Sequence, residues 1–176
     1  MEQEAPDLNL FFPFEPPRMG RLKESRMGHT YSNLVFHVIF STKERRPLIH
    51  DSFRPRLHEY MGGLARAEFR GALAIGGTDN HVHGLLVLPP NLSVSDALCN
   101  WKTLSSKWVH ETLPHEADFG WQEGYGAFSV SQSNVPEVAA YIRGQAEHHK
   151  KMTFEEEFVA LLNRHGIQYD PRYVWD

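Results

Sequence analysis

The order of predicted strands and helices along this chain of 176 residues indicates an α+β fold. Four short runs rich in β-branched, aromatic or apolar residues alternate with segments whose apolar residues recur at helical spacing. A cluster of turn-forming residues, Gly76-Gly77-Thr78-Asp79-Asn80, joins the second and third runs directly, which is typical of a hairpin. The resulting order, β-α-β-β-α-β-α, predicts a ferredoxin-like sandwich in which helices cover a four-stranded antiparallel sheet.

The first half of this pattern consists of a strand, a helix and a hairpin. Tyr31–Thr42 is rich in β-branched and aromatic residues and is expected to be a strand. Ser52–Phe69 is expected to be a helix, because its apolar residues are three or four positions apart. Ala72–Gly76 and Val82–Leu88 are the two strands of the hairpin, and Pro89-Pro90 ends the second of them.

The second half begins with a helix over Ser93–Glu111, for which Ser93 or Ser95 is the expected N-terminal cap. Gly126–Ser131 is the predicted fourth strand. The helix that carries Tyr141 is expected to open with a capping box of Asn134 and Glu137, with Pro136 in its first turn. Thr153 and Glu156 repeat this signature and predict a last helix that ends near Arg164.

The composition is typical of a globular protein that occupies one domain, with 41% hydrophobic and 23% charged residues. No apolar run approaches the roughly 20 residues that span a bilayer, and the acidic N-terminus lacks a secretory signal. The lone Cys99 cannot form an internal disulfide and is expected to be a core or semi-buried helix residue. Together these features predict a protein of the reducing cytoplasm that does not enter a membrane.

The two ends of the chain lack the periodicity of the centre. Residues 1–28 are expected to be a mobile N-terminal extension, and residues 170–176 a C-terminal tail. Met27 stands just ahead of the first strand. We therefore hold as a hypothesis that Met27 is the true start, which a native peptide from residues 1–26 would disprove.

The net charge of −4 argues against a protein that coats duplex DNA. The basic residues are nevertheless unevenly distributed, since they gather after the first strand, on the second helix and beside Tyr141. A local basic groove on an acidic protein is compatible with nucleic-acid binding. The candidate DNA-binding residues are Arg45, Arg46, Lys102, Lys107 and Arg143.

Four polar side chains form the candidate catalytic site. His81 and His83 are two apart on a strand and therefore share a face. Tyr141 and Gln145 are four apart on a helix and also share a face. If this helix packs on this strand, the four side chains converge into three metal ligands and one hydroxyl nucleophile.

Other interpretations of these residues remain open. The two histidines could be structural or simply exposed, and Tyr141 could be an ordinary packing residue. Tyr125 is a rival nucleophile, but it has no ligand-type partner at helical spacing.

Three further groups of residues invite functional interpretations. His148 and His149 are adjacent on a helix, so we expect a solvated or DNA-facing role for them rather than joint chelation of an ion. His37, in the middle of a strand, is interpreted as a satisfied structural histidine. Tryptophans at 101, 108 and 121 could stack on unpaired bases, although core packing is the default for Trp101 and Trp108.

Several segments resemble the IS200-like transposases, the single-tyrosine members of the HUH endonuclease superfamily, which include the REP-associated tyrosine transposases. Residues 30–43, TYSNLVFHVIFSTK, resemble the opening strand of that family, and His81-Val82-His83-Gly84-Leu85-Leu86 resembles its naming motif. Residues 124–131 and 141–145 look like its last strand and catalytic helix. The resemblance runs from about Thr30 to Tyr169, so we assign residues 29–169 to an IS200-like transposase domain.

The resemblance implies a transposase that cleaves and rejoins single-stranded DNA bearing a hairpin. Tyr141 would attack the phosphodiester and form a 5′-phosphotyrosine intermediate, leaving a free 3′-hydroxyl. His81, His83 and Gln145 would hold a divalent cation, Mg or Mn in this family, which neutralises charge on the phosphate. Two alternatives stay open: a domesticated relative that acts on chromosomal palindromic repeats, and a catalytically silent DNA-hairpin binding protein.

The family also implies a homodimer in which strands pair across the interface. The Val35–Phe40 run and the Phe128–Ser131 strand are the candidate interface segments, since an exposed edge strand readily pairs with a second copy. Gly144 and the Gly120–Gly126 loop could let the tyrosine helix serve either subunit. Whether Tyr141 acts in cis or in trans is left open.

Overall fold

The structure is a computed structural model that describes residues 31–175. The predicted N-terminal extension of residues 1–28 and the candidate start at Met27 lie outside the described residues. Among residues 31–175, no helix is long and apolar enough to cross a bilayer.

A four-stranded antiparallel sheet forms the centre of the fold. Its strands are β1 (Leu34–Ser41), β2 (Gly71–Gly77), β3 (His81–Leu88) and β4 (Gly126–Ser129), in the order β2-β3-β1-β4. This order is that of a ferredoxin-like sheet, so the predicted fold class is confirmed.

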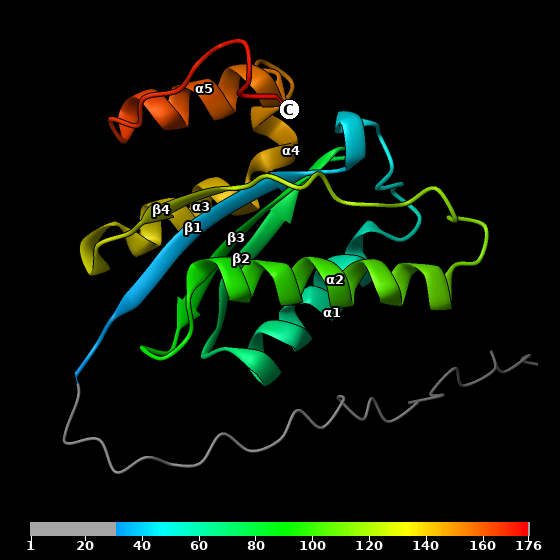
Figure 1. The fold of residues 1–176 in the computed structure, drawn as a ribbon, viewed down its shortest axis with the longest axis horizontal. Helices are drawn as coiled ribbons and strands as arrows, with labels where there is room; N and C mark the ends of the chain where they lie inside the picture. The colour runs from blue at the N-terminus through cyan, green and yellow to red at the C-terminus, as the bar shows by residue number, and fades with distance from the viewer. Residues whose placement is uncertain (1–30, 176) are drawn as a thin grey trace, which may run out of the picture. The chain divides into compact units, whose positions relative to one another are not determined.

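Helices cover both faces of this sheet (Figure 1). On one face lie α1 (Arg54–Glu68) and α2 (Val94–Thr112), and on the other lie α3 (Val135–Arg143), α4 (Gln145–His148) and α5 (Phe154–Arg164). Two single-turn 3-10 helices, η1 (Lys43–Arg45) and η2 (Gln132–Asn134), lie in the connections.

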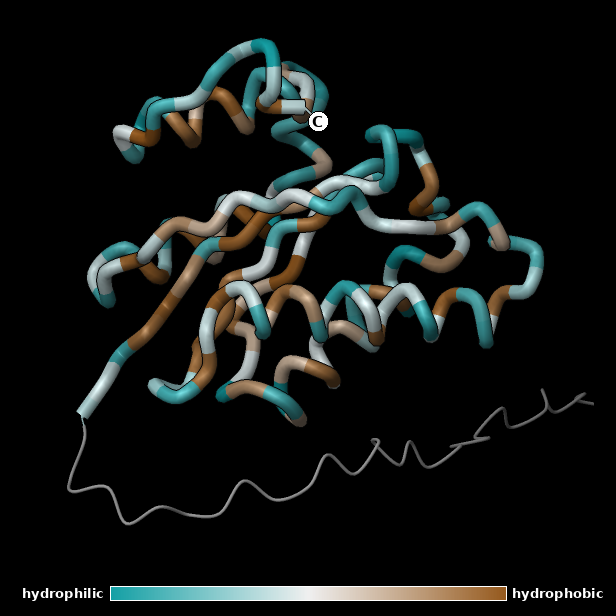
Figure 2. Tube along the Cα trace, in the orientation of Figure 1, coloured by the Kyte–Doolittle hydropathy of each residue, from teal (hydrophilic) through white to brown (hydrophobic). Residues whose placement is uncertain are grey.

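Strand alternation divides the core between the two faces. Val82 and Leu86 of β3 pack with Trp101 toward α1 and α2, in the largest hydrophobic cluster. Leu85, on the opposite face, packs with Ile142 of α3. Figure 2 shows hydrophobic residues concentrated along the strands. Because His81 and His83 alternate with Val82, they lie on the face that α3 covers.

The helix starts partly match the sequence patterns. Ser93 accepts a hydrogen bond from the Asp96 N–H, and Thr153 forms a complete capping box with Glu156. The predicted capping box at Asn134 is wrong. Its backbone already lies in the αR region within a 3-10 turn, whereas a capping residue is usually extended, and its side chain makes no capping bond.

Two further expectations are corrected by the structure. Cys99 is exposed on α2 rather than semi-buried. The Val35–Phe40 run cannot pair with a second copy, because β1 is bonded to β3 on one side and β4 on the other. Of the two proposed interface strands, only β4 lies at a sheet edge.

The last described residues pack on the domain. Val174 and Trp175 join a hydrophobic cluster with Phe154 and Phe158 of α5. The guanidinium of Arg45 lies 5.3 Å from the centre of the Trp175 ring.

Candidate functional site

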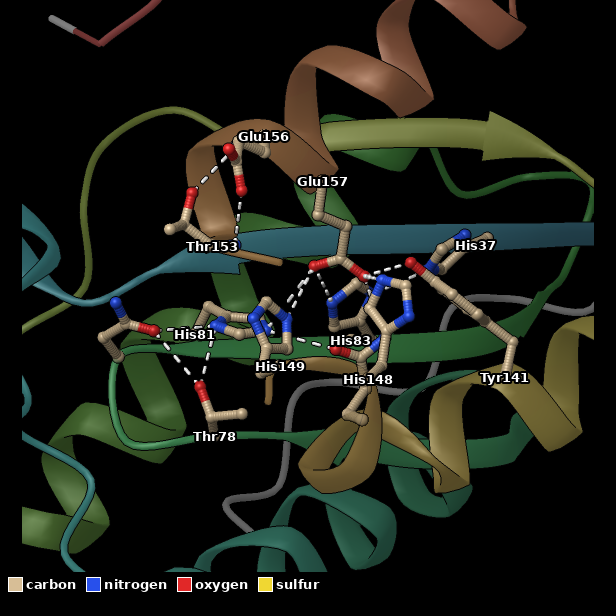
Figure 3. Close-up of polar contacts among 12 residues, drawn as sticks. His37, Thr78, His81, His83, Tyr141, His148, His149, Thr153, Glu156 and Glu157 are labelled. Carbon is tan, nitrogen blue, oxygen red and sulfur yellow. Dashed lines mark hydrogen bonds and ion pairs between the residues drawn. The ribbon is translucent and has the colours of Figure 1, made fainter. Parts of the chain in front are cut away.

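The two histidines of the His81-Val82-His83 motif open β3 and point toward the layer of α3, α4 and α5 (Figure 3). Both side chains have 0% exposure. They are buried because the residues around α4 and α5, among them His149 and Phe154, cover this end of the strand.

Hydrogen bonds on the far side of each imidazole fix its orientation. His83 Nδ1 lies 2.8 Å from His37 Nε2, and His81 Nδ1 lies 2.8 Å from the side-chain oxygen of Asn80. His37 is thus a buried, hydrogen-bonded histidine, as interpreted from its place in the strand. Both motif histidines consequently direct Nε2 toward the same point, as metal-binding histidines do.

A carboxylate from α5, Glu157, occupies that point. Its Oε1 accepts hydrogen bonds from the Tyr141 hydroxyl and, at 2.9 Å, from Gln145 Nε2. Its Oε2 lies 2.9 Å from His149 Nε2 and 3.3 Å from His83 Nε2. Glu157 therefore connects the histidines with the tyrosine, as Figure 3 shows.

Tyr141 and Gln145 do not share one continuous helix, contrary to the prediction. The helix is interrupted at Gly144. Tyr141 therefore lies in the last turn of α3, and Gln145 is the first residue of α4. The two side chains still converge on the histidines, and Gln145 Oε1 lies 3.4 Å from His81 Nε2. The structure thus brings together all four residues of the predicted catalytic constellation.

The approach of α3 to the sheet depends on Gly76 of β2. A Cβ atom at this position would overlap the backbone carbonyl of Ile142, the residue after Tyr141. Only glycine allows such close contact between two backbones. Gly76 therefore sets how near Tyr141 lies to the motif histidines.

Burial keeps the imidazoles of His37, His81 and His83 neutral. It lowers the pKa of His37 to about 3, and it lowers the pKa values of His81 and His83. Neutral imidazoles carry one free lone pair each, which is the form that binds a metal ion.

The acidic groups of the site are shifted in opposite directions. Burial alone would raise the pKa of Glu157, but the adjacent His83 imidazole and hydrogen bonds from Tyr141 and Gln145 outweigh it and hold that pKa well below its usual value. Burial and the neighbouring Glu157 raise the pKa of Tyr141. At neutral pH the site therefore contains an ionised carboxylate and a protonated phenol.

This donor set can hold a divalent metal ion. One ligand atom from each of His81, His83, His149 and Glu157 lies within 4.8 Å of the others. Gln145 adds a neutral carbonyl oxygen beside His81. Imidazole nitrogens with one carboxylate are ligands that Mn²⁺, Co²⁺ and Zn²⁺ accept readily.

Two members of this cluster were missed by the sequence reasoning. His149 was expected to be solvated or DNA-facing, because the side chains of adjacent helix residues point in different directions. In the structure His149 is instead the C-terminal cap of the short α4, at the point where the chain turns toward α5. His148 lies beside Tyr141 instead, with ring centres 5.1 Å apart. Glu157 belongs to the acidic run Glu155-Glu156-Glu157, so the sequence gives no sign that it differs from its neighbours. In the structure it is the one glutamate of the three that is buried.

The rival aromatic residues lie elsewhere. Tyr125 is exposed and lines a groove beside α2 rather than this site. Trp101 is buried in the core and Trp108 stacks on Tyr60, in line with the packing interpretation. Trp121 donates a hydrogen bond to Ser105 and is also half-buried.

All five candidate DNA-binding residues make contacts within the chain. Arg45 and Arg46 form ion pairs with Glu155 and Asp118, at 3.2 and 3.4 Å. The others follow the same pattern: Lys102 donates to the carbonyls of the 122–124 loop, Lys107 pairs with Glu111, and Arg143 donates to the Leu73 carbonyl.

Comparison with known proteins assigns the family. The model of the family "Transposase IS200 like" matches residues 30–145, well over half of the chain. The chain belongs to the IS200-like transposases. It is 27% identical over 133 residues to the transposases for insertion sequence element IS200 of Salmonella typhimurium and Salmonella typhi, which covers 72% of this chain and 86% of theirs.

A solved structure shares the fold of this transposase. A crystal structure from Deinococcus radiodurans R1, described as a candidate transposase, has a TM-score of 0.53 at 22% identity and covers 67% of this chain and 95% of its own. A REP-associated tyrosine transposase bound to a REP hairpin has a TM-score of 0.47 at 13% identity, covering 67% and 70%.

Membership makes the protein a DNA-cleaving enzyme of DNA transposition. The family match ends at Gln145. Glu157 and His149 therefore lie beyond the segment that defines the family.

Proposed function

We propose that this transposase cleaves and rejoins single-stranded DNA through a 5′-phosphotyrosine on Tyr141, with a divalent ion, Mg²⁺ or Mn²⁺, held by His81, His83 and Gln145. One observation supports this proposal above the others. The Tyr141 hydroxyl and the Nε2 atoms of both histidines all face the same carboxylate, Glu157. A nucleophile and a set of metal ligands thus meet in one buried cluster.

The chemistry follows from this geometry. The bound ion would neutralise charge on the scissile phosphate and polarise its P–O bonds. The Tyr141 hydroxyl gives its proton to the Glu157 carboxylate, which accepts its hydrogen bond. Tyr141 Oη forms a bond to phosphorus, the bond from phosphorus to the 3′ oxygen breaks, and that oxygen takes up a proton. The phosphotyrosine keeps the energy of a phosphodiester, so a second 3′-hydroxyl can reverse the step and rejoin a strand without ATP.

A cavity of about 260 Å³ beside Tyr141 offers a route for the DNA phosphate. It is lined by Tyr141, His37, His148, Arg164 and His165, among other residues. The guanidinium of Arg164 would attract a phosphate. The motif histidines lie behind Glu157, so we propose that α5 shifts when DNA reaches the ion.

The exposed basic residues are proposed to hold the DNA outside this cavity. Arg46, Lys107 and Arg143 are exposed, and their contacts within the chain are single surface pairs or carbonyl bonds. Such pairs contribute little to stability, so phosphates can replace them. Arg45 and Lys102 are more deeply engaged, and they are proposed as secondary contacts.

The experiment that tests this function is adduct trapping on hairpin-bearing single strands in Mn²⁺ or Mg²⁺. Wild-type protein should form a band that survives denaturation and disappears with a chelator. Tyr141→Phe should abolish the band and leave DNA binding nearly unchanged, because it removes one hydroxyl from a residue of the same shape.

Tyr125→Phe is the matched control, because it removes the same hydroxyl from an exposed tyrosine outside the site. It should form the adduct like the wild type. An adduct on the Tyr141→Phe protein would overturn the assignment. Tight hairpin binding without any adduct in the wild type would favour a silent hairpin-binding protein.

A further inference from the structure

The lone pairs around Glu157 are arranged in an unusual way. His81 Nδ1 faces two oxygens, that of the Asn80 side chain and that of the Thr78 hydroxyl, which itself donates to Asn80. With both oxygens accepting, Nδ1 carries the proton and Nε2 is a bare acceptor. This Nε2 nevertheless faces two more acceptors, Gln145 Oε1 at 3.4 Å and Glu157 Oε2 at 3.8 Å. Three acceptors directed at one buried point repel one another unless a cation lies between them.

His83 presents a second Nε2 atom to the same carboxylate. Its Nδ1 is bonded to His37, and its buried Nε2 has no hydrogen-bond partner although it lies 3.3 Å from Glu157 Oε2. Burial of a polar atom without a partner destabilises the folded state. A metal ion would satisfy this nitrogen and the carboxylate at once.

The spacing of these atoms suits a single ion. Ligand atoms about 2.1 Å from a metal lie roughly 3–4 Å from one another. Glu157 Oε2 lies 2.9, 3.3 and 3.8 Å from the Nε2 atoms of His149, His83 and His81. Only small shifts would bring all of them to a common centre.

We infer that Glu157 and His149 are further ligands of the divalent ion that His81, His83 and Gln145 hold. This inference rests on the ion site of the proposed function and extends it beyond the segment that defines the family. The Oε1 atom of the same carboxylate accepts the Tyr141 hydrogen bond. Glu157 thus joins the ion to the nucleophile, and α5 completes the site.

The full set of three imidazoles and two oxygens has a chemical consequence. Nitrogen-rich sites prefer Mn²⁺, Co²⁺ or Zn²⁺ to Mg²⁺, which favours oxygen ligands and keeps several waters. We expect the full-length protein without DNA to bind Mn²⁺ at least about tenfold more tightly than Mg²⁺.

The test is a Mn²⁺ titration of the full-length protein without DNA, monitored by calorimetry and by the loss of free-ion electron paramagnetic resonance. Glu157→Gln keeps the shape but removes the anionic ligand, and should weaken Mn²⁺ binding at least about tenfold. Glu147→Gln is the control, since this exposed glutamate of α4 pairs only with Lys150 in the described structure. It should bind Mn²⁺ like the wild type.

Pulsed resonance on bound Mn²⁺ supplies a second readout, because it counts coordinated imidazole nitrogens. The wild type should show three, and His149→Ala two. If Glu157→Gln does not fold, as judged by circular dichroism, the inference is tested by the Mn²⁺ affinity and nitrogen count of His149→Ala. His149 contributes no hydrophobic contact to the core clusters of the described residues.

His83→Ala separates the two proposals. Loss of binding in His83→Ala with unchanged or tighter binding in Glu157→Gln and His149→Ala would overturn this inference and leave the proposed ion site intact. Retention of full Mn²⁺ affinity by His83→Ala would overturn the ion site of the proposed function itself.

Discussion

At the scale of residues, Glu157 is the group that connects the strand histidines with the tyrosine. Strand alternation was enough to place His81 and His83 on one face, and helical spacing brought Tyr141 and Gln145 toward them. Glu157 could not be found in this way, since no local periodicity ties it to the motif. Its role depends on contacts between residues that lie 8 to 76 positions apart in the chain.

A histidine away from the site provides a pH prediction. Burial, with a smaller effect of Arg54, lowers the pKa of His58 from 6.5 to about 4. Between pH 4 and pH 6.5, His58 is therefore protonated in the unfolded chain but neutral in the folded chain. The free energy of unfolding should therefore fall as pH drops from 6.5 toward 4, and His58 contributes no such fall above 6.5.

The loss that His58 causes is at most roughly 3 kcal/mol, at about 1.4 kcal/mol for each pKa unit. Urea unfolding of the metal-free protein at several pH values measures it. His58→Leu, an apolar residue of similar size, should reduce the pH dependence in this window, and the part caused by His37, His81 and His83 should remain. An equal slope in wild type and variant would show that His58 is not the cause.

At the scale of elements, the boundaries of strands and helices matched the sequence patterns closely. The β2–β3 hairpin, α2 with its Ser93 cap and α5 with its Thr153 box formed where turn and capping residues predicted them. The break at Gly144 was not predicted. The Tyr141–Gln145 spacing is equally compatible with an unbroken helix, whereas the chain beyond Gly144 turns and carries His149 and α5 over the sheet.

The close contact between β2 and α3 is tested by Gly76→Ala. The added methyl group would overlap the Ile142 carbonyl, so α3 must move away from the sheet. We expect a loss of about 1–3 kcal/mol in the free energy of unfolding, and a folded fraction with strongly reduced adduct formation because Tyr141 moves with the helix.

Gly63→Ala in α1 is the matched control, because the nearest atom to its new methyl group would be Arg66 Nη2 at 3.9 Å. Alanine at a helical position should leave stability unchanged or raise it by up to about 1 kcal/mol. Full adduct formation by Gly76→Ala would show that the spacing between α3 and the sheet does not control the nucleophile.

At the scale of the whole molecule, the α+β class and the sheet order could be predicted because they depend on element order. The burial of His81 and His83 could not be predicted, since it depends on how α4 and α5 pack against the sheet. The same limit applies to assembly. Only β4 offers a free edge among the proposed interface strands, and we propose that a homodimer pairs through it.

Mixtures of two variants test whether Tyr141 in such a dimer acts with the histidines of its own chain or with those of the partner. In the structure Tyr141 contacts Glu157 and lies beside His83 of its own chain. We therefore expect that mixing Tyr141→Phe with His81→Ala does not restore cleavage. Restored cleavage would show that the tyrosine serves the partner's histidines, and a monomeric mass at micromolar concentration in light scattering would exclude the dimer.

The central claim is that Tyr141 is the residue that becomes attached to DNA. Its most direct test is peptide mapping by tandem mass spectrometry, after the trapped adduct has been digested with protease and nuclease. We predict a nucleotide joined through its 5′-phosphate to Tyr141, and a free 3′-hydroxyl on the released strand. A nucleotide on Tyr125 or any other residue, or cleaved DNA with no attached peptide, would contradict this claim.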